Sequence, residues 1–142
     1  MAFDIACLDT YTRSQSGTDM TVTNPRSNAP MLRDDGSPVT ITLHGRASDQ
    51  YREKQREIQQ GRADRAARGI ATNSDEIAQE DVAILIACTV TWNIDEMDGK
   101  PFPASPDNIR LLWSDHRFMG LRDRAIRHIL DDGNFLPVSS AA

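Results

Sequence analysis

The chain has 142 residues and a mass of 15.8 kDa, which suits one domain large enough to bury a core. Its net charge of −5 disfavours non-specific binding to nucleic acid, because phosphates select basic surfaces. Two cysteines exclude a disulfide framework and a four-thiolate zinc site, and no apolar run or signal-like N-terminus indicates a membrane span or export, so we expect a soluble protein of the reducing cytoplasm.

Two short alternating segments predict an N-terminal β-hairpin. Residues 1–17 hold few apolar side chains and end in Ser-Gln-Ser-Gly, so we expect a flexible lead there. In segments 18–23 and 39–43, apolar residues alternate with threonines, which is the period of a half-buried strand. The connection between them holds three prolines and an Asp-Gly turn pair. Because two strands alone are marginally stable, this hairpin should pack on helices or join the sheet of another subunit.

A polar helix is expected next, from Asp49 to about Arg68. Ser48 is placed to cap its N-terminus, and Gly69 is placed to end it. Apolar residues are few, while six Lys and Arg side chains lie beside four acids. A helix that is polar all round projects into solvent or awaits a partner.

The following helix is expected to be buried. Asn73 and Glu76 have the spacing of a capping box, and the run Val82–Cys88 is apolar on every face. The next residues alternate as in a strand, but the apolar run is too long for one ordinary strand. We therefore predict helix through about Trp92, with a strand over Thr89–Ile94 as the alternative.

Two further helices complete the expected elements. After an acidic loop, Ser105 and Pro106 are the residue types of an N-cap and a first helical position, so a short helix should begin there. A final helix is expected over Asp115–Leu130, with Gly133 ending it in the left-handed conformation. Phe135 can then fold back onto the core.

The expected fold is α+β and mostly helical. A single domain spans residues 18–136, made of a β-hairpin over 18–44 and about four helices over 45–136. A flexible lead (1–17) and a C-terminal tail (137–142) lie outside it.

No motif for catalysis or for a metal stands out. His44, His116 and His128 lie too far apart in sequence for a standard metal signature. The spacing of His128 and Asp132 on a helix indicates an ordinary surface pair. The acidic loop Asp95–Gly99 lacks the ligand positions of a calcium loop, and phosphate-binding loops, a nucleophile elbow and HExxH are absent. We expect no catalytic residues, no cofactor, no metal and hence no enzyme.

Charge is segregated along the chain. Between Gly69 and Gly99 the sequence has seven acidic residues and no basic residue. The helix expected before this segment has six basic residues and four acids. These charges either pair with one another inside the protein, or form complementary patches that orient self-association or a partner. The basic helix lacks the interleaved aromatic residues that would favour RNA.

Three segments combine strand, cap and turn residues in a specific order. Residues 39–52 read as a strand that runs into a Ser-Asp-capped helix with an early Tyr. Residues 83–94 end in Thr-Trp-Asn-Ile before an acidic loop with Gly-Lys-Pro-Phe. Residues 102–109 (Phe-Pro-Ala-Ser-Pro-Asp-Asn-Ile) lead to a closing helix and Gly-Asn-Phe-Leu. Together, over about residues 18–136, they resemble the small tail assembly chaperones of long-tailed, siphovirus-type bacteriophages.

This resemblance implies a non-enzymatic helper of tail morphogenesis. Such proteins bind and solubilise the tape measure protein and help recruit tail tube subunits, so these two proteins and further copies of the chain itself are the implied partners. Nucleic acid and membrane are not implied. The protein would act in the host cytoplasm during assembly and be absent from the mature virion.

A chaperone for a long helical chain needs apolar grooves at helical spacing. The candidate partner-binding residues share large apolar or aromatic side chains on the expected helices, with packing in the core as the competing interpretation for each: Tyr51, Ile84, Leu85, Trp92, Leu112, Trp113 and Phe118.

Two other functions stay open. A structural component of the virion, such as a tail or head–tail connector protein retained in the particle, would use the hairpin and the N-terminal lead for strand exchange between neighbours. A small acidic inhibitor of a nucleic-acid enzyme is favoured by charge alone.

Overall fold

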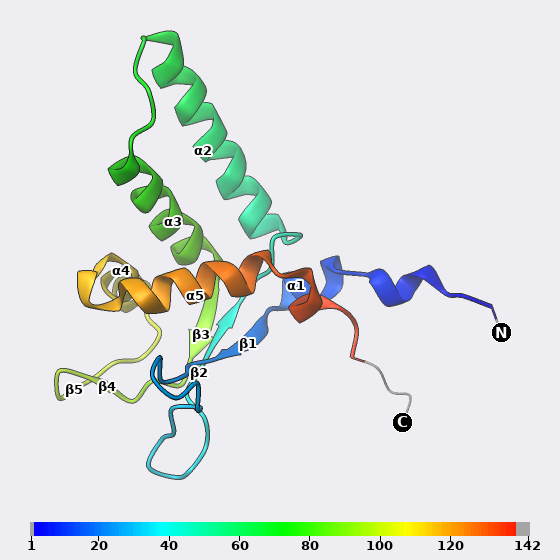
Figure 1. Ribbon diagram of the computed structural model, residues 1–142, viewed down its shortest axis with the longest axis vertical. Coiled ribbons are helices and arrows are strands. Elements are labelled where there is room, and N and C mark those ends of the chain that lie inside the picture. Colours follow the sequence, from blue (N-terminus) through cyan, green and yellow to red (C-terminus); the bar gives the residue numbers. More distant parts are fainter. Residues whose placement is uncertain (1, 139–142) are drawn as a thin grey trace.

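A three-stranded antiparallel sheet joins the N-terminal and middle parts of the chain (Figure 1). The structure is a computed structural model that describes residues 2–138. Its strands β1 (Thr18–Thr21), β2 (Thr40–Leu43) and β3 (Thr89–Trp92) pair in the order β1-β2-β3. The antiparallel pairing of β1 with β2 confirms the predicted hairpin.

Helices make up most of the remaining chain, so the fold is α+β and 53% helical, as predicted. In the described residues, the further elements are short 3₁₀ helices, α-helices and one two-stranded hairpin: η1 (Ile5–Leu8), α1 (Tyr11–Ser16), α2 (Asp49–Ala67), α3 (Ser74–Cys88), β4 (Glu96–Met97), β5 (Lys100–Pro101), α4 (Pro106–Ser114), η2 (His116–Phe118), α5 (Met119–Leu130) and η3 (Asp132–Phe135).

The predicted helix starts are confirmed by their caps. The Ser48 hydroxyl accepts a hydrogen bond from the backbone N–H of Tyr51 at 3.2 Å, and Asn73 and Ser105 cap α3 and α4 in the same way. At the end of α2, Gly69 has φ +76°, the left-handed conformation that glycine adopts without strain. Local side chains therefore determine the residues at which these three helices begin.

The second helix ends earlier than the sequence predicts. α3 stops at Cys88, and the next four residues form β3 instead of continuing the helix to Trp92, so the strand alternative is correct in part. Ile41 of β2 pairs with Trp92, and this ladder satisfies backbone groups on both strands. Tertiary pairing with β2, which the apolar run does not reveal, decides against helix at this point.

The N-terminal lead is more structured than the sequence predicts, because η1 and α1 replace an extended segment. Ser14 of α1 is buried, and its carbonyl accepts a hydrogen bond from the backbone N–H of Gly45 at 3.1 Å. The guanidinium of Arg13 donates to the carbonyl of Leu136 at 2.7 Å. These contacts, which come from distant parts of the chain, hold α1 against the body.

The C-terminal end also differs in detail. α5 begins at Met119 after the short η2, and it ends at Leu130 without a left-handed glycine. Gly133 instead lies inside η3, where its N–H donates to the Asp131 side chain at 3.0 Å. Phe135 is fully buried, so the predicted return to the core is confirmed. Residues 139–142 of the expected tail lie outside the described part.

The core lies between the sheet and helices α3, α4 and α5. Helix α2 buries none of its residues and projects from the body beside α3 as a long helical hairpin, as its polar sequence predicts (Figure 1). The buried apolar side chains of the core are Met20, Ile41, Leu43, Ile84, Leu85, Cys88, Trp92, Phe102, Ile109, Leu112, Trp113, Ala125 and Ile129.

Candidate functional site

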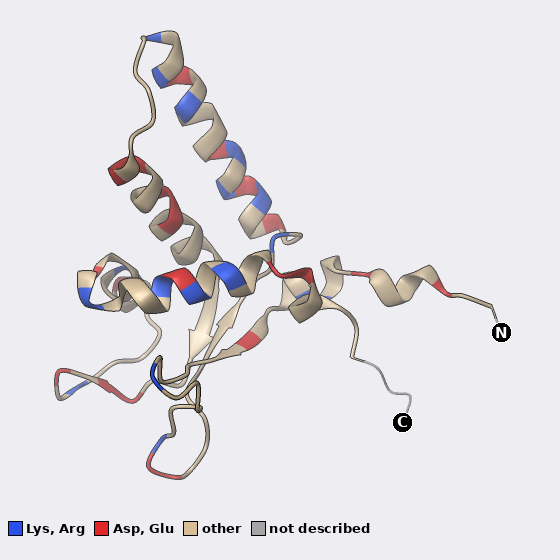
Figure 2. Ribbon diagram, in the orientation of Figure 1, with Lys and Arg blue, Asp and Glu red and all other residues tan. Residues whose placement is uncertain are grey.

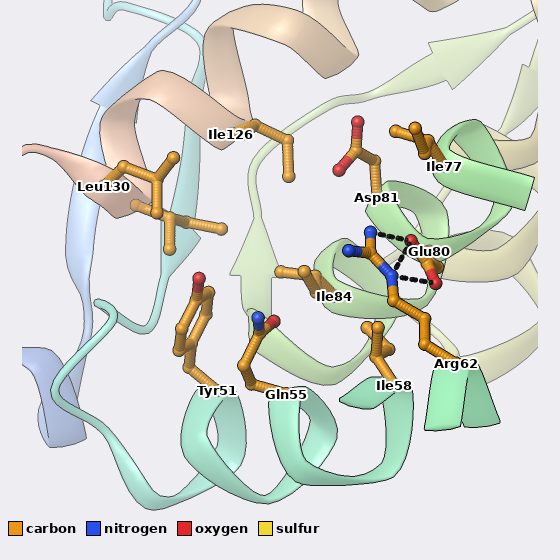
Figure 3. A pocket seen from close by; sticks show the side chains of 11 residues that line it. Tyr51, Gln55, Ile58, Arg62, Ile77, Glu80, Asp81, Ile84, Ile126 and Leu130 are labelled. Carbon is orange, nitrogen blue, oxygen red and sulfur yellow. Dashed lines mark hydrogen bonds and ion pairs between the residues drawn. The ribbon is translucent and has the colours of Figure 1, made fainter. Parts of the chain in front are cut away.

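A pocket of about 180 Å³, lined by both aliphatic and polar side chains, lies where α5 crosses the base of the α2–α3 hairpin (Figure 3). Three helices supply its walls, and Figure 3 shows their side chains converging on it. The lining residues are Tyr51, Gln55, Ile58, Arg62, Ile77, Glu80, Asp81, Ile84, Ile126, Ile129 and Leu130.

Branched aliphatic side chains form the inner part of this pocket. Ile129 is fully buried and Ile84 is 8% exposed, so they belong to both the pocket floor and the core. Ile77 on α3 and Leu130 on α5 each remain 46% exposed at the rim. An apolar concavity with exposed large aliphatic residues at its edge is typical of a binding surface.

Helix α2 contributes one aromatic and one amide side chain to the opposite wall. Tyr51 and Gln55 lie one helical turn apart, and both point toward α5 in Figure 3. Burial raises the pKa of the Tyr51 phenol, so its hydroxyl stays protonated at neutral pH. This wall therefore offers an aromatic face together with neutral hydrogen-bonding groups.

An ion-pair network closes the outer end of the pocket. The Nε atom of Arg62 lies 3.0 Å from a Glu80 oxygen, and Arg65 Nε lies 2.7 Å from Glu76. The hydrogen bond from Arg62 lowers the pKa of Glu80, so this carboxylate stays charged. The network connects α2 to α3 where few apolar side chains do so.

Asp81 differs from Glu80, the other acid of the pocket, because its pKa is raised and not lowered. It is half-buried, and burial together with the charge of Asp123 raises the pKa of Asp81. Asp81 therefore adds a polar group to the wall of the pocket.

Acidic residues of α3 lie beside the basic residues of α2 (Figure 2), and Glu76 and Glu80 form ion pairs across this hairpin. Besides the α2–α3 network, Arg33 pairs with Asp95 at 2.7 Å and Arg117 pairs with Asp98 at 2.9 Å. Internal pairing, the first of the two interpretations, therefore accounts for four of the seven acids of this segment.

The structure places only two of the predicted partner-binding residues in the pocket, Tyr51 and Ile84. Phe118 is half-buried on the core, with the Arg117 guanidinium 5.2 Å from its ring centre. The other four are buried core residues in this structure, as the competing interpretation holds: Leu85, Trp92, Leu112 and Trp113.

The two tryptophans have clear structural partners. The Trp92 ring stacks on Phe102 at 5.2 Å, and its Nε1–H donates to the Phe102 carbonyl at 2.8 Å. Trp113 donates from Nε1 to the Thr89 hydroxyl at 3.0 Å. Both indole N–H groups are satisfied inside the protein, as buried tryptophans require.

Sequence reasoning missed most of the pocket, although a signal for it exists. Ile58 follows Tyr51 by seven residues and Ile84 follows Ile77 by seven, which places each pair on one helix face. The pocket requires these two faces and α5 to meet, and spacing within single helices does not give that arrangement.

The histidine pair expected from spacing does not form. His128 is half-buried and its Nε2 lies 2.9 Å from the Thr18 hydroxyl, while Asp132 pairs with Arg46 at 2.6 Å. Over residues 2–138, no three His, Cys, Asp or Glu side chains gather closely enough to hold a metal ion.

None of the helices described in residues 2–138 has the length and apolarity to cross a membrane.

Comparison with protein-family models, with curated proteins and with solved structures finds no match for this chain. What the pocket accepts therefore follows from its own walls. They consist of branched aliphatic side chains, one phenol, one amide and the Asp81 carboxyl group, with Arg62 and Glu80 paired at one end. This composition suits a short row of apolar side chains from another polypeptide.

Proposed function

We propose that this chain is a binding protein that shelters apolar side chains of a partner helix, and that it acts as a phage tail assembly chaperone on the tape measure protein. The observation that carries the proposal is the pocket between α2, α3 and α5, whose rim exposes Ile77 and Leu130. The resemblance of the sequence to tail assembly chaperones supplies the identity of the partner.

The physical basis is the removal of apolar surface from water. Burying one Leu- or Ile-sized side chain of a partner is worth about 1.5–3 kcal/mol, so a pocket of this size supports weak, reversible binding. A tape measure protein is a long helical chain, and many copies bound along it would keep it soluble without any single tight contact. Weak individual binding also permits release once tube subunits are recruited.

Substitutions at the rim test this proposal. Ile77→Glu and Leu130→Glu place a charge beside the pocket at exposed positions, so they should leave folding intact and abolish partner binding. Leu111→Glu is the matched control, because Leu111 is 55% exposed on α4 outside this pocket. The measurement is the soluble fraction of co-expressed tape measure protein.

The proposal predicts solubilisation by the wild type and by the Leu111→Glu variant, and aggregation with either rim variant. Equal solubilisation by all four proteins would contradict the pocket as the binding site. No increase in solubility with the wild type would contradict the chaperone function itself.

A structural virion component is the second candidate, and one specific observation favours it. Phe3, Ile5 and Leu8 are exposed on an arm that leaves the body, as subunit-linking arms of assembled particles do. Mass spectrometry of purified particles separates the two functions. A chaperone should be missing from mature particles, whereas a structural component should be present in stoichiometric amount.

A further inference from the structure

We propose that the N-terminal arm of one copy docks onto the α2 wall and pocket of a second copy, so that the chain associates with itself head to tail. The arm is the segment Phe3–Asp9, which contains η1. The inference concerns the same pocket as the proposed function, but it needs no other partner and is tested on the protein alone.

The arm is ordered and apolar, yet its apolar side chains touch little of their own chain. Phe3, Ile5 and Leu8 are 74%, 68% and 56% exposed. The Asp4 side chain caps η1 by accepting a hydrogen bond from the Ala6 N–H at 3.0 Å. A short segment that presents three large apolar residues to water is a surface that association would cover.

Hydrogen bonds at Asp9 direct this arm away from the pocket of its own chain. The Asp9 carboxylate accepts from the N–H groups of Tyr11 and Thr12 at 2.9 and 3.1 Å and from the Thr12 hydroxyl at 2.6 Å. The Tyr11 hydroxyl in turn donates to Asp49 at the start of α2, at 3.2 Å. Figure 1 shows the arm leaving the body on the side away from the α2–α3 hairpin.

Charge complementarity selects the docking face. The arm carries Asp4 and Asp9 and no basic residue. On α2, Arg52 and Arg56 are exposed one turn apart, and within residues 2–138 neither forms an ion pair. A shallow depression beside these arginines shares Tyr51 with the apolar pocket. The arm thus matches this face in both charge and apolarity.

The resulting contact joins two different surfaces of the same chain. Such a heterologous contact builds a closed ring if the rotation between neighbours closes, and an open filament if it does not. Every copy carries one arm and one receiving face, so assembly consumes them in equal number.

Native Cys7 allows a direct test, because it lies in the arm and is exposed. Cys88 is buried, and burial raises the pKa of its thiol to about 12, so a maleimide reagent modifies Cys7 selectively. Unlabelled protein carrying benzophenone on Cys7 is mixed with ¹⁵N-labelled protein whose Cys7 is blocked, and is then illuminated. Isotope masses of the cross-linked peptides report whether the contact joins two chains.

The expected result is cross-links from unlabelled Cys7 to ¹⁵N peptides of α2 around Arg52 and Arg56. Cross-links confined to the unlabelled chain would mean that the arm folds back onto its own pocket, and would overturn the inference. Cross-links scattered over the surface, or none at all, would overturn it as well.

Charge reversal gives an independent measurement on unmodified protein. Arg52→Glu with Arg56→Glu should weaken self-association in sedimentation by about tenfold or more, since it places like charges opposite the arm. The double variant Arg26→Glu with Arg68→Glu changes the net charge by the same amount and is the control, because both arginines are exposed and lie outside the proposed docking face; it should leave the association constant unchanged. Equal association of all three proteins, or a monomeric wild type, would contradict the inference without bearing on tape measure binding.

Discussion

The buried hydroxyl of Thr89 connects three elements of the core. It donates to the Leu85 carbonyl at 2.6 Å and accepts from the Trp113 Nε1–H at 3.0 Å, so it links the end of α3, the start of β3 and helix α4. Both partners are buried polar groups for which water is not an alternative. The Thr89 hydroxyl therefore stabilises the fold by forming hydrogen bonds with these two buried groups, the Leu85 carbonyl and the Trp113 N–H.

Replacing Thr89 by Val keeps the shape of this residue and removes its hydroxyl. The buried Trp113 N–H then lacks an acceptor, and we expect the free energy of unfolding to fall by about 1–3 kcal/mol. Chemical denaturation measures this change. Thr91→Val is the matched control in the same strand, where the side chain is exposed, and it should change stability by about 0.5 kcal/mol at most.

His128 makes stability depend on pH near neutrality. Burial lowers its pKa, although Asp131 and Asp19 partly oppose this effect. The folded protein therefore favours the neutral ring, so this stabilisation is present above the unfolded pKa of about 6.5 and is lost as pH falls below it.

We expect His128→Gln, which keeps a polar group near Thr18 without titrating, to remove that part of the pH dependence. Denaturation midpoints between pH 5 and 8 measure it. His116→Gln is the control, because His116 is exposed. An unchanged pH profile in His128→Gln would contradict the assignment.

At the scale of elements, ion pairs hold the outer part of the α2–α3 hairpin together. Glu80 is the common acceptor, since Arg62 hydrogen-bonds to it and Arg65 lies 3.6 Å from it. The pKa of Glu80 is lowered by Arg62, so its contribution is present above the unfolded pKa and is lost as pH falls through the folded one.

Glu80→Gln should therefore loosen α2 without unfolding the body. We expect a loss of about 1 kcal/mol, seen as faster hydrogen exchange of α2 amides while core amides keep their protection. Glu57→Gln is the control: Glu57 also pairs with a basic residue, Lys54, but is 59% exposed, and its removal should leave α2 exchange unchanged. Salt should reduce the difference between wild type and Glu80→Gln.

The elements that could be predicted from sequence are those fixed by local side chains. Ser48, Asn73 and Ser105 cap their helices through hydrogen bonds that reach only three residues along the chain. The change from helix to strand after Cys88 depends on pairing with β2, which lies far away in sequence, so the local alternation offered this strand only as an alternative to helix. The pocket was missed for the same reason.

For the whole molecule, Gly45 marks the place where α1 and η3 meet the body. A Cβ atom there would lie 2.2 Å from the Ser14 hydroxyl and 2.9 Å from the Phe135 ring. Ser14 belongs to α1 and Phe135 to η3, so a side chain at this position would separate both terminal segments from the body.

We expect Gly45→Ala to destabilise the protein by about 1–3 kcal/mol, because the buried Ser14 and Phe135 cannot both move aside. Gly120→Ala provides a control of opposite sign, since its Cβ would meet no atom within 4 Å and alanine favours helix α5. Thermal unfolding measures both. A Gly45→Ala variant with unchanged stability would contradict the close packing of Ser14 and Phe135 against Gly45.

The α2–α3 hairpin leaves and re-enters the sheet at one point, where the His44 N–H donates to the Cys88 carbonyl at 2.8 Å. Residues 45–87 therefore form a single connection between the neighbouring strands β2 and β3. Its tip, beyond the Arg65–Glu76 ion pair, can gain whole helical turns while the strand register and the pocket stay unchanged. The length of the α2–α3 hairpin can thus change independently of the rest of the fold, both in evolution and in protein engineering.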